Sequence, residues 1–488
     1  MKSYKILFLF IFFSILLNSK VFAQWEPDQR LTNTAGNSFL ANNNAWNIAA
    51  SGDSIHVIYI EYQSGNSQIY YTCSYNAGLN WNTPVMLSQG PCDILNYTLA
   101  VSGSTVHVVW INNMDNRLIY RRSTNAGITW EQEDTIVYPG VQNVGEPCLA
   151  ASGNNVYLVY THNPASGYNV DLFFITSTNG GVSWSAAQRL TYDTNNIMDG
   201  APSIAVSGNI LHLIWGRVSN PSNWHRRVLY LRSTNNGASW EPERYITTDT
   251  VSQSQPCIAA SGNYVHAVWM DTRNDTLQIF YRLSQDNGIN WQPEIPLTHN
   301  IIMADYQTIA AIGRNVHVAW RDYRFSNQWH IGYRRSMDNG QTWQPDTFFY
   351  DAFHQESPSI AVAGTKVHLI WIDNRAGNWE IYYKRNPTGS GIEEPEHSLL
   401  HPTTSPFEIY PNPAKSLATI HYSLSTNSIV SMQLYDVSGK FIKTLSKESQ
   451  TAGDYSKLLN TKNLSAGVYF ITLRSKSDKI VRRLVICR

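Results

Sequence analysis

The sequence predicts an all-β protein, in which a seven-bladed β-propeller closed by its N-terminal strand is followed by a small β-sandwich domain. Three observations predict this fold. A short apolar phrase recurs seven times, four strand-like runs bounded by turn residues accompany each copy, and the pattern changes after residue 386. The 488 residues are enough for two or three domains of ordinary size.

The recurring phrase is five residues long and ends in Trp or Tyr. Its copies follow one another at intervals of 50 to 55 residues and begin at Ile55, Val106, Val156, Leu211, Val265, Val316 and Val367. Four runs of five to eight residues in each copy are typical of a propeller blade. We therefore expect the propeller to span residues 24–386. The second residue of the phrase is His in six copies and Tyr157 in the third, and we interpret it as a structural inter-strand residue.

The way in which the ring closes can also be predicted. In six blades a fourth strand starts at a Trp, and a seventh run of this kind, residues 25–32, lies at the N-terminal end of the propeller. The last blade shows only three strands, the third near residues 380–385. We expect the N-terminal run to pair with that strand, because this leaves no open sheet edge.

Composition excludes several classes of protein. Lys and Arg number 36, as do Asp and Glu, so the formal net charge is zero and a broad nucleic-acid-binding surface is not expected. Aromatic residues make up 12% of the chain against 15% charged residues, which is not the composition of a disordered protein. The five Cys are widely spread and show no zinc-ligand spacing, so we expect no metal site, no disulfide framework and no cofactor.

The first 23 residues have the features of a signal peptide. Lys2 and Lys5 precede an apolar run of 12 residues, 6–17, and Ala23 supplies a small residue before the expected cleavage site. The run is too short to span a membrane, and no other stretch approaches the required length. We therefore expect a mature chain that is exported and has no transmembrane segment.

A second phrase, Ser-x-Asx-x-Gly-x-x-Trp, occurs six times in phase with the repeat. Its copies are residues 74–81, 123–130, 177–184, 233–240, 284–291 and 336–343. They resemble the Asp box, or BNR repeat, of the sialidase superfamily, with Asp at Asp286 and Asp338 and Asn in the other four. The Asx side chain can cap backbone N–H groups, and the Gly can take a positive φ. The resemblance implies the propeller fold, but not an activity, because Asp boxes are structural.

The C-terminal part resembles a second known family. Residues 387–406 are rich in Pro, Ser and Thr and are predicted to be a linker. Residues 407–488, with Tyr-Pro-Asn-Pro at 410–413 and a basic final strand, resemble the type A sorting domain of type IX secretion substrates. This resemblance implies that the type IX secretion machinery is a partner of residues 407–488, and that the protein is secreted or attached to the cell surface.

Repeat symmetry helps to separate structural from functional residues. A residue present in every blade serves the blade, whereas a ligand near the axis meets each blade differently. The pairs Asp271/Arg273, Asp322/Arg324 and Asp373/Arg375 recur, so we interpret them as structural ion pairs. The variable connections, from strand two to strand three and from strand four to the next blade, lie on one rim, where we expect the site.

Two groups of residues on this rim break the repeat. Arg217 stands where other blades have an acid, and an insertion follows it. The candidate ligand-binding residues are Arg217, Trp224, His225, Arg226, Arg227, Arg321, Trp329 and His330. They suggest a basic, aromatic pocket for an acidic sugar, in which guanidinium groups hold a carboxylate. We then expect Arg217→Ala to weaken ligand binding and Arg375→Ala to lower stability.

Catalytic residues cannot be assigned from the sequence. Acidic and Tyr side chains precede strand one in several blades, and the weak candidates are Glu146, Asp199, Asp305, Tyr306 and Glu356. The sialidase resemblance implies an arginine triad, a Tyr nucleophile with a Glu partner and an Asp acid/base. The Phe/Tyr-Arg-Ile-Pro motif of that family is missing, so none of these roles is carried over.

Two function classes remain open at this point. The first is a secreted or surface-attached propeller that binds a glycan or glycoconjugate without a standard sialidase catalytic set. The second is a carbohydrate-active enzyme, either an exo-sialidase-like glycoside hydrolase or a lyase of acidic polysaccharides. The missing motif favours the first class, and the unusual residues 217–227 are compatible with the second.

Overall fold

The computed structural model describes most of the propeller and of the C-terminal domain. The described residues are 25–41, 46–63, 65–90, 92–137, 144–163, 169–192, 197–218, 225–248, 251–273, 276–299, 303–325, 328–349, 353–387, 407–410, 414–424, 426–436, 440–475 and 479–486. The predicted signal peptide, Trp224 and all but the first residue of the predicted linker lie outside them. The chain divides into two compact units, residues 1–392 and 393–488, and each is described by itself.

The larger unit consists of seven antiparallel sheets, and its described residues contain no helix. Blade 1 is β2 (Asn37–Phe39), β3 (Ile48–Ser51), β4 (Ser54–Gln63), β5 (Asn66–Ser74) and β6 (Val85–Met86), and blade 2 is β7 (Ile94–Ser102), β8 (Thr105–Asn112), β9 (Arg117–Ser123) and β10 (Asp134–Val137). Blade 3 is β11 (Val144–Ser152), β12 (Asn155–His162), β13 (Asp171–Ser177) and β14 (Gln188–Arg189), and blade 4 is β15 (Met198–Ser207), β16 (Ile210–Val218), β17 (Arg226–Ser233) and β18 (Arg244–Tyr245).

The remaining three blades follow the same order. Blade 5 is β19 (Gln253–Ser261), β20 (Tyr264–Asp271), β21 (Gln278–Ser284) and β22 (Ile295–Pro296), and blade 6 is β23 (Ala304–Ile312), β24 (Asn315–Phe325), β25 (Gln328–Ser336) and β26 (Thr347–Phe349). Blade 7 is β27 (Gln355–Ala363), β28 (Lys366–Asp373) and β29 (Glu380–Asn386), completed by β1 (Gln29–Arg30).

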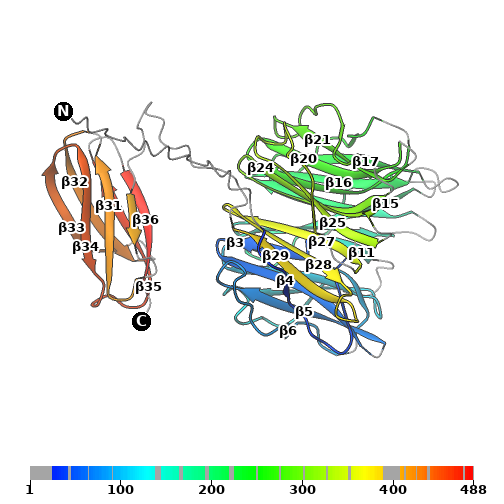
Figure 1. Ribbon diagram of the computed structural model, residues 1–488, viewed down its shortest axis with the longest axis horizontal. Coiled ribbons are helices and arrows are strands. Elements are labelled where there is room, and N and C mark those ends of the chain that lie inside the picture. The colour runs from blue at the N-terminus through cyan, green and yellow to red at the C-terminus, as the bar shows by residue number, and fades with distance from the viewer. Residues whose placement is uncertain are drawn as a thin grey trace, which may run out of the picture. The chain divides into compact units, whose positions relative to one another are not determined.

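The blades form a closed ring. The first strand of each blade contacts the first strand of the next, through β3, β7, β11, β15, β19, β23 and β27, and β27 returns to β3. Figure 1 shows β27 to β29 beside β3 and β4, although these strands come from opposite ends of the propeller sequence. This arrangement agrees with the predicted seven-bladed ring.

The N-terminal strand completes the last blade, as the sequence predicts. Strand β1 pairs with β29 in the register Gln29↔Tyr383 and Arg30↔Tyr382. Beside this short ladder, Trp25 packs edge-on against the Tyr333 and Phe349 rings. The N-terminal segment therefore closes the ring by both pairing and packing.

Strand two of each blade carries the core. Its terminal Trp is fully buried in five blades, at Trp110, Trp215, Trp269, Trp320 and Trp371. The recurring His is also buried, and its Nδ1 lies 2.6 to 2.8 Å from a Tyr hydroxyl on strand three in all six copies. This pairing agrees with the structural role predicted for the histidines.

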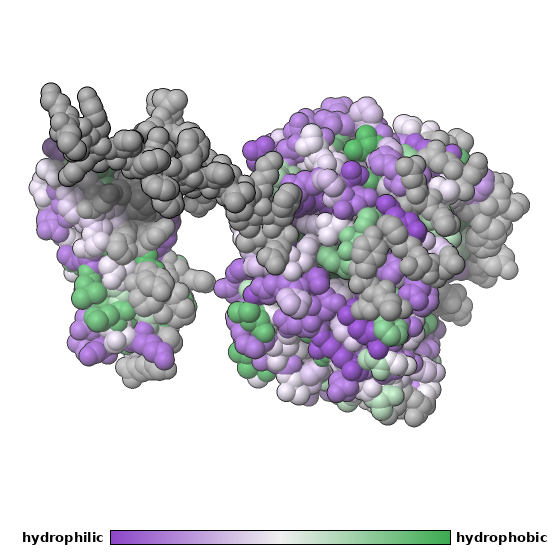
Figure 2. All heavy atoms as spheres, in the orientation of Figure 1, coloured by the Kyte–Doolittle hydropathy of each residue, from purple (hydrophilic) through white to green (hydrophobic). Residues whose placement is uncertain are grey.

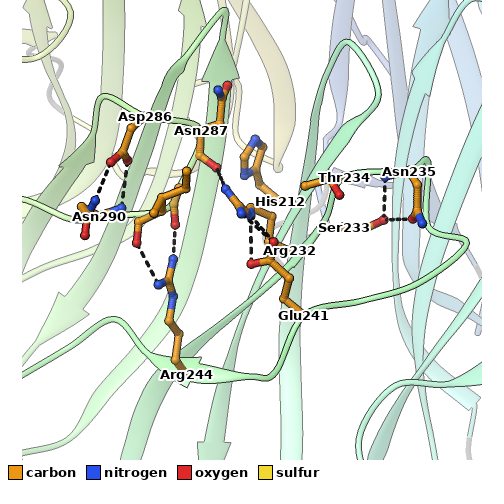
Figure 3. A network of polar contacts seen from close by, with 12 residues as sticks. His212, Arg232, Ser233, Thr234, Asn235, Glu241, Arg244, Asp286, Asn287 and Asn290 are labelled. Atoms are coloured by element: carbon orange, nitrogen blue, oxygen red, sulfur yellow. Dashed lines mark hydrogen bonds and ion pairs between the residues drawn. The ribbon is translucent and has the colours of Figure 1, made fainter.

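The Asp boxes tie each blade to the next, as Figure 3 shows for blades 4 and 5. The Ser284 hydroxyl donates to Asp286 at 2.8 Å and accepts the backbone N–H of Gly288 at 2.9 Å, which closes the turn. Arg232, which directly precedes the box of blade 4, binds Glu241 of its own blade and the carbonyl of Asn287 in the next. The boxes therefore hold the scaffold together on the face opposite the variable loops.

The smaller unit is a two-sheet sandwich. One sheet is β30 (Phe407–Tyr410), β31 (Leu417–Leu424) and β34 (Gly453–Asn460), and the other is β33 (Phe441–Gln450), β32 (Ser428–Asp436), β35 (Gly467–Arg474) and β36 (Lys479–Ile486). Ile420, Leu434, Ile471 and Leu484 are fully buried between the sheets. The β-sandwich predicted after the propeller is therefore confirmed.

Candidate functional site

The candidate residues lie on one rim of the propeller. In blade 4, Asp199 at the start of strand one is opposite Arg217 at the end of strand two, which is opposite Arg227 at the start of strand three. In blade 6, Asp305 is opposite Arg321 in the same way. Antiparallel pairing thus brings the starts of strands one and three and the end of strand two to the same side, as the strand order predicts.

A repeated β-bulge shapes this rim. In blades 3 to 7 the register of strand one shifts near its start, and one residue there adopts a positive φ of 43 to 51°: Glu146, Ala201, Gln255, Tyr306 and Ser357. The backbone geometry is the same in each blade, but the side chain differs. The bulge therefore presents a different side chain in each of these blades on the same backbone geometry.

The sequence analysis missed this bulge, although a signal for it exists. Pro147, Pro202, Pro256 and Pro358 follow the positive-φ residue in four of the five blades, and a Pro near the start of a strand suits a bulge. The positive φ itself could not be read from the sequence, because five different non-glycine residues occupy the position.

Side chains of the bulges connect neighbouring blades. Glu146 accepts the backbone N–H of Ala201 at 2.6 Å, and Gln255 accepts the backbone N–H of Tyr306 at 3.3 Å. Burial raises the pKa of the Glu146 carboxyl, while the Ala201 N–H and the nearby Arg226 guanidinium act in the opposite direction. Glu146 is therefore a half-buried acid whose pKa is raised, with a positive φ, beside the rim.

Arg217 is buried and paired with two carboxylates instead of being open to a ligand. Its side chain is buried, its guanidinium donates twice to Asp199 at 2.7 and 3.0 Å, and it donates to Glu243 at 3.0 Å. The Trp215 indole N–H also donates to Asp199, at 2.9 Å. With two carboxylates on its guanidinium, the contacts of Arg217 do not favour the ligand-binding role predicted for it.

Blades 5 to 7 contain the same combination of a Trp indole, a buried Asp and an Arg, but there the Asp lies on strand two. In blade 5, Asp271 accepts from the Trp269 indole and from Arg273, and Arg273 also binds Glu294, directly before strand four, at 2.7 Å. In blade 4 the acid has moved to strand one, as Asp199, and the arginine has taken its place on strand two. Arg217 is thus a compensated variation of the repeat and not a true break in it.

Arg321 forms a different cluster between blades 6 and 7. Its guanidinium donates to both oxygens of Asp305 at 2.8 and 2.7 Å and lies 3.3 Å from Glu356 of the next blade. The Tyr306 and Trp329 rings both lie against it, with centroids 4.3 and 3.8 Å from its Cζ. Hydrogen bonding and the Asp305 charge raise the pKa of Arg321 despite its burial. Four further candidates from the sequence analysis are thus in direct contact with Arg321: Asp305, Tyr306, Trp329 and Glu356.

The other candidates do not join this cluster. Arg227 lies over the Tyr245 ring at 3.8 Å and donates to the Thr247 carbonyl at 3.2 Å, and His225 is exposed. His330 is buried beside its cross-strand partner Asp322. Arg217 and its partners belong to blade 4 and Arg321 to blade 6, with blade 5 between them in the ring.

Within the described ranges, no group of three or more His, Cys, Asp or Glu side chains is arranged to hold a metal ion. In the same part of the chain, no helix has the length and hydropathy needed to cross a membrane.

Comparisons with known proteins agree with this architecture. Residues 114–293 match the BNR repeat-like domain, and residues 408–487 match the secretion system C-terminal sorting domain. None of the curated proteins matches the chain significantly.

Solved structures resemble the chain in fold but not in sequence. The polysaccharide lyase Uly1 is similar with a TM-score of 0.52 and 10% identity, over 74% of this chain and 99% of that one. The Hadza microbial sialidase Hz136 has a TM-score of 0.42 and 11% identity over 67% and 73%, and a Trypanosoma rangeli sialidase 0.44 and 9% over 82% and 84%. At these identities the likeness shows the fold alone.

The sorting domain places the protein outside the cell, secreted or at the cell surface. The repeated Asp boxes, the seven sheets and the two family matches lead to one conclusion: the chain has a sialidase-like β-propeller fold that contains a BNR repeat-like region, followed by a C-terminal type IX secretion sorting domain.

Proposed function

We propose that the propeller binds a glycan at the loop-side rim, in the cluster formed by Asp305, Tyr306, Arg321, Trp329 and Glu356. The observation that supports this most is the position of Arg321 between two aromatic rings and two carboxylates. Aromatic faces offer apolar surface to the C–H face of a sugar ring, and convergent charged groups can hold its hydroxyls.

The charges of the cluster favour a neutral sugar. One guanidinium faces two carboxylates, and Asp305 already accepts two hydrogen bonds from Arg321. A ligand carboxylate would have to displace these partners and would meet the negative charge of Asp305 and Glu356. A hydroxyl-rich, uncharged glycan can instead add hydrogen bonds without breaking the ion pair.

A glycan array with neutral and acidic oligosaccharides tests this proposal. Neutral glycans should bind, and Trp329→Ala should weaken that binding by about 2 kcal/mol, roughly thirty-fold, because a truncated aromatic anchor typically costs that much. Tyr192→Ala is the matched control, because Tyr192 is an exposed aromatic residue that also lies over an arginine, Arg189, but in blade 3. Exclusive binding of acidic glycans, or equal effects of the two substitutions, would count against the proposal.

A second candidate function is acid-catalysed cleavage of a glycan with Glu146 as the proton donor. A carboxyl group can donate a proton near neutral pH only if its pKa is raised, and burial raises the pKa of Glu146. Blade 5 supplies the test, because Gln255 makes the corresponding bond to the next blade in an uncharged form. Glu146→Gln should therefore keep the fold and abolish any hydrolysis, whereas unchanged hydrolysis would exclude this role.

A further inference from the structure

The sandwich unit contains a cavity at the seam between its two sheets. The cavity has a volume of about 220 Å³ and lies between β33, the edge of one sheet, and β34, the edge of the other. Ile420 and Leu459, which are buried, and the half-buried Leu445 provide its aliphatic lining. In the described part of the unit, β33 pairs only with β32 and β34 only with β31, so both strands have an open side at this seam.

Two lysines of these edge strands line the cavity. Lys457 is half-buried and pairs with the fully buried Ile420, so its side chain starts toward the sandwich interior, because paired residues of neighbouring strands point to the same face of a sheet. Lys443 pairs with the fully buried Leu434 beside a shift in register, and its own side chain is exposed. The Lys457 ammonium lies 4.0 Å from a carboxylate oxygen of Glu448.

Inward-pointing charges on edge strands normally prevent strand addition. An added uncharged strand would cover the Lys443 and Lys457 ammonium groups without bringing a counter-charge of its own, which is costly. A strand that carries carboxylates at the facing positions would neutralise them instead. The seam therefore selects among extended segments by charge, rejecting most and accepting an acidic one.

The charge of the unit and its surface are consistent with such a partner. Residues 407–488 contain 12 Lys and Arg against five Asp and Glu, a net charge of +7, whereas residues 24–406 carry a net charge of −10. Leu458, next to Lys457 on β34, is 64% exposed, and Figure 2 shows hydrophobic side chains at the surface of this unit. A positively charged edge with an exposed leucine suits an acidic segment that also has apolar residues.

We propose that the seam between β33 and β34 is a docking site for an extended acidic segment of a partner protein, which adds as a strand beside β34 and places carboxylates on Lys443 and Lys457. A protein partner is favoured over a lipid because open strand edges offer rows of backbone hydrogen-bonding groups with which another strand can pair in register and a lipid cannot. The match to a sorting domain also requires that this unit be recognised by something outside the chain.

Fluorescence anisotropy with the full-length chain tests the docking site. The probe is an eight-residue peptide of alternating Glu and Val with blocked ends, and the comparison peptide alternates Lys and Val. The Glu/Val peptide should bind the wild-type chain at least tenfold more tightly. The double variant Lys443→Glu/Lys457→Glu should reverse this preference. Lys415→Glu/Lys462→Glu, which removes two exposed lysines of the same unit, should change either affinity less than threefold.

A second variant keeps the test decisive if the charge reversal disturbs the fold. Lys443→Met/Lys457→Met should lose the preference for Glu over Lys and should bind an uncharged Thr/Val peptide that the wild type rejects. An equal loss of binding in both glutamate double variants would overturn the proposal, because it would mean general charge attraction. Binding of anionic phosphatidylglycerol vesicles that depends on Lys443 and Lys457, with no peptide binding, would also overturn it.

Discussion

The glycines of the Asp boxes show how one residue type is required by its neighbour in the preceding blade. A Cβ added to Gly288, at φ +79°, would lie 1.9 Å from the Tyr230 hydroxyl of the preceding blade. Five further boxes place their glycine against the equivalent ring of the preceding blade, namely Gly78, Gly127, Gly181, Gly237 and Gly340. The glycine is needed both for the turn and for the close approach of the tyrosine.

We therefore expect Gly288→Ala to destabilise the protein by about 2–4 kcal/mol, from backbone strain together with overpacking. Gly262 is the matched control, because it also has a positive φ, +58°, but an added Cβ would meet no atom within 4 Å. Gly262→Ala should cost only about 1 kcal/mol. Denaturant unfolding of the two variants measures the difference, and equal costs would show that the ring contact is unimportant.

Whether a charged residue is structural depends on its partners on the other strands of the same blade. Arg217 differs from the acids at the equivalent position of blades 5 to 7, yet Asp199 on strand one and Glu243, directly before strand four, supply the carboxylates that it needs. A test of repeat symmetry at single positions cannot detect such an exchange, because the compensating residues lie 18 and 26 positions away in the sequence.

Arg217→Ala should consequently lower stability, by about 3–5 kcal/mol, because it leaves the buried Asp199 without its partner. Arg375→Ala should have a similar effect, since Arg375 pairs with the buried Asp373 and with Asp28. Thermal unfolding and glycan binding should be measured together. Wild-type stability with lost glycan binding in Arg217→Ala would restore the interpretation made from the sequence.

The N-terminal segment acts as an element of the last blade through several contacts. Glu26 binds Arg385 at 2.7 Å, Asp28 binds Arg375 at 2.8 Å, and Arg30 binds the buried Glu380 at 2.7 Å. These contacts join residues about 350 positions apart, so they close the largest loop of the propeller.

Deletion of residues 25–32 should destabilise the propeller by at least about 3 kcal/mol, the low end of the usual cost of removing a core Trp, because the half-buried Trp25 and the β1 pairing are lost together. It should also expose the free side of β29 and cause self-association that depends on concentration. Denaturant unfolding and analytical ultracentrifugation check both effects. A deleted chain that stayed monomeric with wild-type stability would contradict the closure described here.

The whole ring could be predicted from the sequence, whereas the site could be predicted only in part. The period of the Trp-ending phrase and the Asp boxes indicate the blades, because each blade packs against its neighbours through the same positions. The Tyr306–Arg321–Trp329 stack could not be foreseen, because it depends on the bulge that gives Tyr306 its φ of 49°. Local pattern thus predicts the scaffold, and side-chain pairing across blades determines the site.

The six buried histidines make the stability of the whole propeller depend on pH. Burial lowers the pKa of His56 and His107 to about 4 and of the other four, His212, His266, His317 and His368, to about 3. In the unfolded chain a histidine binds a proton below about pH 6.5. Between pH 6.5 and 4 the unfolded state therefore binds more protons, so stability is lost as the pH falls, by up to about 1.4 kcal/mol per pH unit for each histidine.

Blade 3 shows an arrangement that lacks the buried histidine and keeps the packing. There Tyr157 and Phe174 replace the His and Tyr, and the Tyr157 hydroxyl donates to Asn236 of the next blade at 2.8 Å. In blade 5, Asn339 of the next box has the same positive φ as Asn236, so the double variant His266→Tyr/Tyr281→Phe should reproduce the blade 3 arrangement. Denaturant unfolding at pH 7, 6 and 5 should show a smaller loss of stability in the double variant, by about one proton. An unchanged pH dependence would mean that His266 does not stay neutral in the folded protein.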